Sequence, residues 1–129
     1  MENLKILIIE DDPTTCNLLK TTLELEGYQA SFVHSVENDD VAALLNDQQP
    51  DLLFLDFHLG NVNALKYMTA IRNDSHWQNL PVLMTSAIDL TQECLEAGAN
   101  GCIVKPFNWD EIAARVSQIR NQIFNGKEA

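Results

Sequence analysis

The chain has 129 residues, 46% of them hydrophobic and 21% charged, a composition typical of one globular domain rather than of a disordered segment. Its 19 acidic and 8 basic residues give a net charge of −11, which repels phosphate backbones and argues against nucleic-acid binding through this domain. No apolar run approaches the roughly 18 residues of a membrane span, the N-terminus lacks the features of a signal peptide, and three widely separated cysteines form no zinc motif. We therefore expect a cytoplasmic protein that makes no contact with membranes.

The first part of the chain predicts a strand, a helix and a second strand. Residues 4–9 are apolar at nearly every position, which is typical of a strand that is covered on both faces. Pro13 after the capping residue Asp12 marks the start of a helix, and Gly27 marks its end. Residues 30–33 indicate a weaker strand, which we place at an edge of the sheet.

The middle of the chain continues the alternation of helices and strands. Apolar residues within 41–45 mark a helix that ends at residues 49–51, and an apolar strand follows at residues 52–55. The apolar spacing within residues 64–71 predicts a third helix.

Two more strands, at residues 82–84 and 102–104, complete the predicted sheet. Asp89 and Gln92 resemble a capping box for the helix between them, which Gly98 would close. The last helix shows a capping pair and an apolar stripe, made of Asn108 with Glu111 and of Ile112, Val116, Ile119 and Ile123. Just inside it, Trp109 fits either a core anchor or an exposed patch.

This order predicts five strands that each precede a helix. Right-handed crossovers between parallel strands, with helices on both faces, produce a doubly wound α/β sandwich of three layers. We expect a single domain over residues 1–129, either as a protein of its own or as the N-terminal module of a longer one. In such sheets, ligands bind beyond the carboxyl ends of the strands.

Residues with distinctive chemistry follow four of the strands at that edge. They are Glu10 and Asp11 after the first strand, Asp56 after the third, Thr85 and Ser86 after the fourth, and Lys105 after the fifth. Clustered carboxylates repel one another unless a cation lies between them, and an open site of hard oxygen ligands suits Mg²⁺. We expect Asp11 and Asp56 to bind the ion directly and Glu10 to act through water, with a main-chain carbonyl from the loop after Asp56 as a further ligand.

The remaining groups suit a phosphoryl group. Lys105 can hold one phosphoryl oxygen, or pair with Asp56 when no phosphoryl group is bound. The hydroxyl of Ser86 can bind a second oxygen, and Asp56 is then a carboxylate nucleophile that forms an aspartyl phosphate.

Five segments in the right order resemble the receiver domain of two-component response regulators. They read IIEDDP at 8–13, PDLLFLD at 50–56, LPVLMTSA at 80–87, GA at 98–99 and KPF at 105–107. The resemblance implies a flavodoxin-like fold with strand order 2-1-3-4-5. It also implies that Asp56 accepts phosphate from a histidine kinase or a histidine phosphotransfer protein, so that the domain catalyses only its own phosphorylation and dephosphorylation.

The same resemblance implies a role for each site residue. Glu10 and Asp11 would be the acidic pair, and the backbone carbonyl of His58 would be the third protein ligand to Mg²⁺. Ser86 would be the hydroxyl that moves on phosphorylation, and Lys105 would be the invariant lysine, followed by a cis proline. The fourth helix, fifth strand and fifth helix would form the face that meets an effector or a second copy of the chain.

Three positions depart from the family pattern. Gly60 stands where the family usually has proline and Ala64 where it usually has glycine, so we expect a more mobile loop after the acceptor. Cys102 replaces an aromatic residue whose ring usually turns inward on activation. A thiol cannot act through ring rotation, so the usual coupling to an output is in doubt.

Three other functions fit parts of this pattern. An aspartate-nucleophile phosphatase needs a second acid two residues after the nucleophile, where this chain has His58. A flavin-mononucleotide carrier needs a phosphate-binding loop after the first strand, where this chain has acids at 10–12. A degenerate receiver that acts only as an interaction module would lack part of the acid, hydroxyl and lysine set, which is complete here.

Overall fold

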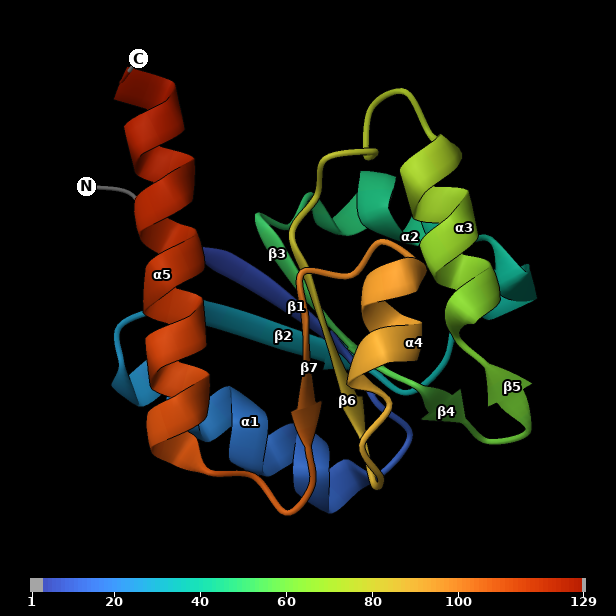
Figure 1. Cartoon of the computed structure of the whole chain (residues 1–129), viewed down its shortest axis with the longest axis horizontal. Coiled ribbons are helices and arrows are strands. Elements are labelled where there is room, and N and C mark those ends of the chain that lie inside the picture. The colour runs from blue at the N-terminus through green and yellow to red at the C-terminus, as the bar shows by residue number, and fades with distance from the viewer. Residues whose placement is uncertain (1–3, 129) are drawn as a thin grey trace.

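The computed structural model describes the backbone of residues 4–128 and the side chains of residues 4–125. A five-stranded parallel sheet with order β2-β1-β3-β6-β7 lies between two layers of helices (Figure 1). The elements are β1 (Lys5–Ile9), α1 (Pro13–Leu25), β2 (Gln29–Val33), the 3₁₀ turn η1 (Glu37–Asp39), α2 (Val41–Gln48), β3 (Leu52–Asp56), β4 (His58–Leu59), β5 (Val62–Asn63), α3 (Leu65–Asn73), β6 (Val82–Ser86), α4 (Thr91–Glu96), β7 (Gly101–Val104) and α5 (Trp109–Glu128).

This arrangement confirms the predicted doubly wound sandwich. The strands β4 and β5 form a separate two-stranded antiparallel sheet, so the five strands of the main sheet have the predicted order 2-1-3-4-5 when they are counted alone. The weaker strand, β2, lies at an edge, as expected. Among the described residues, every helix is too short or too polar to cross a membrane.

The side chains of the sheet alternate between two cores. Leu7, Leu53 and Met84 face one cluster that also holds buried residues of α2, α3 and α4. Ile8 and Phe54 belong to the other cluster, which includes the buried faces of α1 and α5. Successive strand residues point to opposite faces, so a residue's position along its strand decides which helical layer it meets.

Most helix starts follow the sequence signals, but α4 does not. Asp12 caps α1 by accepting a hydrogen bond from the backbone of Thr15, and Asn108 accepts one from the Glu111 amide at 3.2 Å. The predicted capping box at Asp89 is wrong. Its Oδ1 instead accepts hydrogen bonds from both the amide and the hydroxyl of Thr91, at 3.0 and 2.6 Å, and α4 begins only there.

Both tryptophan side chains make contacts that stabilise the fold. Trp77 is buried, and its indole N–H donates to Asn46 Oδ1 at 2.8 Å. Trp109 is half-buried, packs against the core beside α1 and α5, and has the ring of Phe107 at 5.7 Å. This contact favours the anchor over the exposed patch for Trp109.

Asp39 ties the 3₁₀ turn η1 to α3. It accepts a hydrogen bond from the Tyr67 hydroxyl at 2.6 Å and pairs with the Lys66 ammonium at 2.9 Å. These two contacts, with the Tyr67 hydroxyl first, hold the pKa of the Asp39 carboxyl below its ordinary value of 3.8. A depressed carboxyl pKa stabilises the folded state above that value and loses this contribution as the pH falls through the folded-state pKa.

We predict that Tyr67→Phe raises the pKa of Asp39 toward 3.8 and lowers the free energy of unfolding at pH 7, because the folded state loses a hydrogen bond to an ionised carboxylate. The stability difference from the unmodified protein should shrink as Asp39 becomes protonated at acid pH. Carboxyl ¹³C titration and denaturant unfolding at several pH values measure both effects. Tyr28→Phe is the control, and an equal effect of Tyr28→Phe on Asp39 would contradict the assignment.

Candidate functional site

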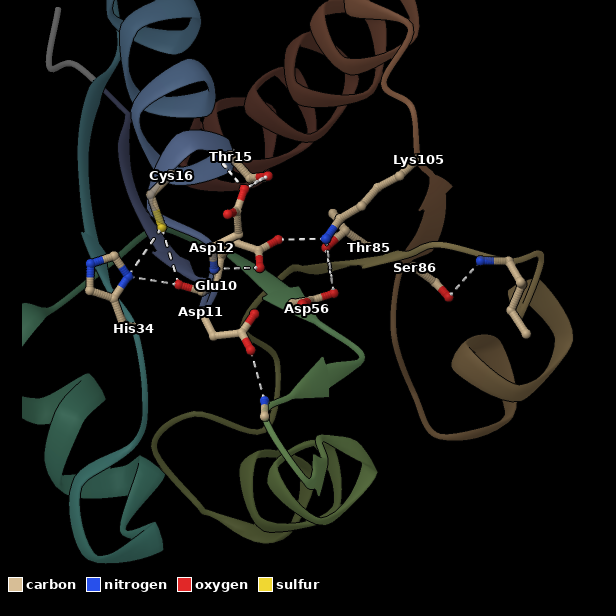
Figure 2. A network of polar contacts seen from close by, with 12 residues as sticks. Glu10, Asp11, Asp12, Thr15, Cys16, His34, Asp56, Thr85, Ser86 and Lys105 are labelled. Carbon is tan, nitrogen blue, oxygen red and sulfur yellow. Dashed lines mark hydrogen bonds and ion pairs between the residues drawn. The ribbon is translucent and has the colours of Figure 1, made fainter.

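Strand alternation brings four polar side chains together at the carboxyl edge of the sheet (Figure 2). Phe54 faces the core beside α1 and α5, so Asp56, two residues later on β3, points to the same side. Thr85 lies within β6, and Glu10 and Lys105 directly follow β1 and β7. All three stand two residues after a strand residue that faces the same core, namely Leu83, Ile8 and Ile103. Glu10, Asp56 and Thr85 are 1%, 6% and 2% exposed, so two carboxylates are buried at this edge.

The ammonium of Lys105 lies between these carboxylates. Its Nζ is 2.7 Å from Glu10 Oε1 and 3.5 Å from Asp56 Oδ1. The sequence predicted pairing with Asp56, and the structure adds Glu10 as the closer partner. Glu10 needs a counter-charge because it is almost fully buried, and a buried charge is costly unless it is paired.

Burial dominates the electrostatics of Glu10. Loss of solvent raises the pKa of Glu10 to about 7, although its hydrogen bonds with Lys105 and the backbone of Asp12 oppose that rise. Both carboxylate oxygens are engaged, since Oε2 accepts from the Asp12 amide at 3.1 Å. For Lys105, burial lowers the pKa, but the hydrogen bond with Glu10 and the charges of Asp56 and Glu10 outweigh it, so the pKa is raised overall.

Asp11 reaches the site from the other side of the β1 terminus and is exposed. Its Oδ2 accepts a hydrogen bond from the Gly60 amide at 2.9 Å, and this bond is the main reason why the pKa of Asp11 is lowered. Gly60 is the first residue of the two-residue turn between β4 and β5. Its φ of +60° is typical of the turns that place glycine at this position of a hairpin.

The segment after Asp56 forms a short β-hairpin, and the greater mobility expected of it stays a prediction. His58 pairs with Asn63, and Leu59 pairs with Val62, in an antiparallel ladder shortly after β3. A proline at position 60 could not donate the hydrogen bond that Gly60 gives to Asp11, because proline has no N–H. The glycine therefore allows the turn and also supplies a donor to the acidic cluster.

The acidic cluster has the donor set of a site for a hard cation. One carboxylate oxygen from each of Glu10, Asp11 and Asp56 lies within 4.8 Å of the other two. Oxygen ligands of this kind suit Mg²⁺, so these residues fit the predicted ion. The side chain of His58 is exposed and its ring lies 4.9 Å from that of Phe57, while the role of its carbonyl stays a prediction.

The last two residues of β6, Thr85 and Ser86, both carry hydroxyl groups, and their side chains face opposite sides of the sheet. Thr85 Oγ1 donates to Asp56 Oδ1 at 3.4 Å. Ser86 Oγ accepts a hydrogen bond from the Ile88 amide at 3.3 Å and points away from Asp56 in Figure 2. The sequence predicted a role only for Ser86. Leu83 faces α1 and α5, and Thr85 lies two residues later on the same strand, so it faces the same side as Asp56. This alternation is the sequence signal that could have identified Thr85 as a site residue.

Cys16 and His34 contact the backbone of Glu10, and no signal in the sequence predicted this role. The Cys16 thiol donates to the Glu10 carbonyl at 3.1 Å, and His34 Nδ1 lies 3.0 Å from the same oxygen. Burial first, and then the charges of nearby acids, raise the pKa of Cys16 to about 11, so it stays a neutral thiol. The pair holds the backbone from which Glu10 extends.

Cys102, where the family pattern has an aromatic residue, lies buried on β7 and packs among residues of the core beside α4. Cys94, on α4, belongs to the same buried cluster and has Cys102 as its neighbour. Burial first, and then this neighbour, raise the pKa of Cys94 to about 12. The space at this position is therefore filled by two cysteine side chains.

Comparisons of the sequence with known proteins all point to the same family. The sequence model of the response regulator receiver domain matches residues 6–117. The DNA-binding dual master transcriptional regulator RpaA of Synechocystis sp. is 35% identical over 115 residues, which cover 87% of this chain and 47% of the relative. The phosphate regulon transcriptional regulatory protein PhoB of Escherichia coli is 29% identical over 92% of this chain and 52% of its own length.

Solved structures agree with this match. The N-terminal domain of the nisin resistance regulator NsrR is 30% identical, with a TM-score of 0.77 over 92% of this chain and 98% of that chain. A response regulator from Thermotoga maritima is 25% identical, with the same TM-score and the same coverage. The chain thus aligns with nearly the whole of these solved chains but spans about half the length of the curated relatives it matches.

We predict that the amide hydrogen of Gly60 exchanges slowly with solvent, although Gly60 lies on an exposed turn, because this amide donates a hydrogen bond to Asp11. Asp11→Ala should speed its exchange by about tenfold or more. Asp12→Ala is the matched control, since Asp12 caps α1 instead, and it should leave the Gly60 amide unchanged. Amide exchange measured by NMR without divalent cations tests this, and fast exchange in the unmodified protein would contradict the contact.

Proposed function

The chain belongs to the response regulator receiver domain family, and from this premise we propose that Asp56 accepts a phosphoryl group in a two-component system. The donor would be a histidine kinase or a histidine phosphotransfer protein. The observation that carries the proposal is the Lys105 ammonium, which lies within 3.5 Å of Asp56 Oδ1 and 2.7 Å of Glu10 Oε1. A nucleophilic carboxylate beside a cation is the arrangement that phosphoryl transfer to aspartate needs.

We propose that Mg²⁺ assists this reaction, held by Asp11, Asp56 and the backbone carbonyl of His58, with Glu10 acting through water. The three carboxylates lie close enough to share one ion, and Glu10 already uses both its oxygens within the protein. When bound, Mg²⁺ supplies positive charge that offsets the carboxylates and the phosphoryl oxygens. This set agrees with the known preference of receiver domains for Mg²⁺.

Lys105 and Ser86 would bind the transferred group. Lys105 is only partly buried, so its flexible side chain can turn from Glu10 toward a phosphoryl oxygen. Ser86 must leave the Ile88 amide to reach another phosphoryl oxygen. That movement would displace the segment between β6 and α4, and so couple the chemistry at Asp56 to α4.

The output would pass through the face that α4, β7 and α5 form, which is also the proposed surface for a homodimer. Cys102 and Cys94 fill the β7–α4 contact without an aromatic ring, so we propose that the position of α4 itself carries the signal. The effector is a protein or an output domain rather than nucleic acid bound by this domain, whose net charge is −11. Residues 1–129 would form one receiver module.

A phosphatase is the main alternative function, and the site does not favour it. A sustained hydrolase with an aspartate nucleophile needs an acid two residues later, and that position holds the exposed His58. We therefore propose that the domain catalyses only the gain and loss of its own phosphoryl group.

We predict that a small phosphodonor such as acetyl phosphate labels the protein in the presence of Mg²⁺ and that Asp56→Asn abolishes this labelling. Asp51→Asn is the matched control, because Asp51 lies at the other end of β3, where it accepts from the Lys5 amide. Intact-mass spectrometry and an acid-stability assay of the label measure the outcome. Labelling that persists in Asp56→Asn, or continuous turnover of phosphate esters, would overturn the proposal.

A further inference from the structure

We infer that the Thr85 hydroxyl shortens the lifetime of the phosphoryl group on Asp56. It donates a hydrogen bond to Asp56 Oδ1 at 3.4 Å from a side chain that is only 2% exposed. This inference rests on the proposed phosphorylation of Asp56 and concerns how long the mark persists. It gives Thr85 a role that differs from the one proposed for Ser86, which would bind a phosphoryl oxygen.

The position of Thr85 is fixed by the sheet. Thr85 is the register partner of Asp56 in the parallel pairing of β3 with β6, so the two side chains point to the same face. The Thr85 carbonyl also accepts a hydrogen bond from the Phe57 amide at 2.8 Å, directly after the acceptor. Both strands are buried in the centre of the sheet, so the backbone keeps Thr85 beside Asp56 when the phosphoryl group arrives.

The hydrogen bond distinguishes the two oxygens of Asp56. Thr85 and Lys105 both contact Oδ1, so Oδ2 is the oxygen that is left for the phosphoryl group. Lys105 can move to the phosphoryl oxygens, since its long side chain is flexible. Thr85 is then the donor that remains on Oδ1.

This donor favours the loss of the phosphoryl group. During hydrolysis, the bond between phosphorus and Asp56 Oδ2 breaks, a water oxygen bonds to phosphorus, and a proton of that water passes to solvent. The electron pair of the broken bond stays on Asp56, which becomes a carboxylate whose charge is shared between both oxygens. A hydrogen bond to a carboxylate is stronger than one to a neutral ester carbonyl, so Thr85 stabilises the leaving group as charge develops on it.

The test follows the decay of the label in three variants. After labelling with acetyl phosphate and Mg²⁺, the donor is removed and the remaining label is measured over time. Thr85→Val keeps the shape of the side chain and removes the hydroxyl, and we expect the half-life of the label to rise about 3- to 10-fold. Thr85→Ala should have the same effect, while Thr85→Ser should keep a half-life within about twofold of the unmodified protein.

Thr69→Val is the control for the substitution itself, because the Thr69 hydroxyl donates to Leu65 on the outer surface of α3, and its half-life should be unchanged. An unaltered half-life in both Thr85→Val and Thr85→Ala would overturn the inference, as would an equal increase in Thr85→Ser. In either case the label itself would still support the acceptor role of Asp56. Absence of any label in the unmodified protein would overturn both proposals.

Discussion

The pairing of one ammonium group with two buried carboxylates is the interaction on which the site depends. Glu10 and Asp56 end adjacent strands, and Lys105 reaches both of them from β7, which lies beyond β6. Without Lys105, two charges would share a poorly hydrated edge of the sheet, and the neutral form of Glu10 would be favoured further. The same cation contacts Oδ1 of Asp56, so a contact that compensates for burial would also leave Oδ2 for the proposed phosphoryl group.

The fold was accessible from the sequence because its signals are local. Apolar runs without alternation marked the buried strands, and residues such as Asp12 and Asn108 marked helix starts through hydrogen bonds that span three residues. The start of α4 was missed for a related reason. The Asp89 carboxylate can accept hydrogen bonds from several nearby donors. It accepts from Thr91 because of the local backbone geometry, which a capping pattern in the sequence does not predict.

The gathering of Glu10, Asp11, Asp56 and Lys105 was also predictable, because the ends of parallel strands meet at one edge, whereas the Ser86 hydroxyl points away from Asp56. The contacts within the site were not predictable. The bond from Gly60 to Asp11 and the pair between Lys105 and Glu10 join residues 49 and 95 positions apart, and their formation depends on how a hairpin and a long side chain settle in three dimensions. Thr85 could have been identified, since strand parity alone places it on the side of Asp56.

The opposite orientations of Thr85 and Ser86 have a consequence for how such a domain can diverge. These residues are neighbours in the chain, yet one faces the layer of α1 and α5 and the other turns toward the segment that leads to α4. A substitution at either position therefore alters a different part of the molecule. With the roles proposed for Thr85 and Ser86, timing and readout would be separately adjustable, so related proteins could change the duration of a signal by a substitution at one position without altering the surface that delivers it.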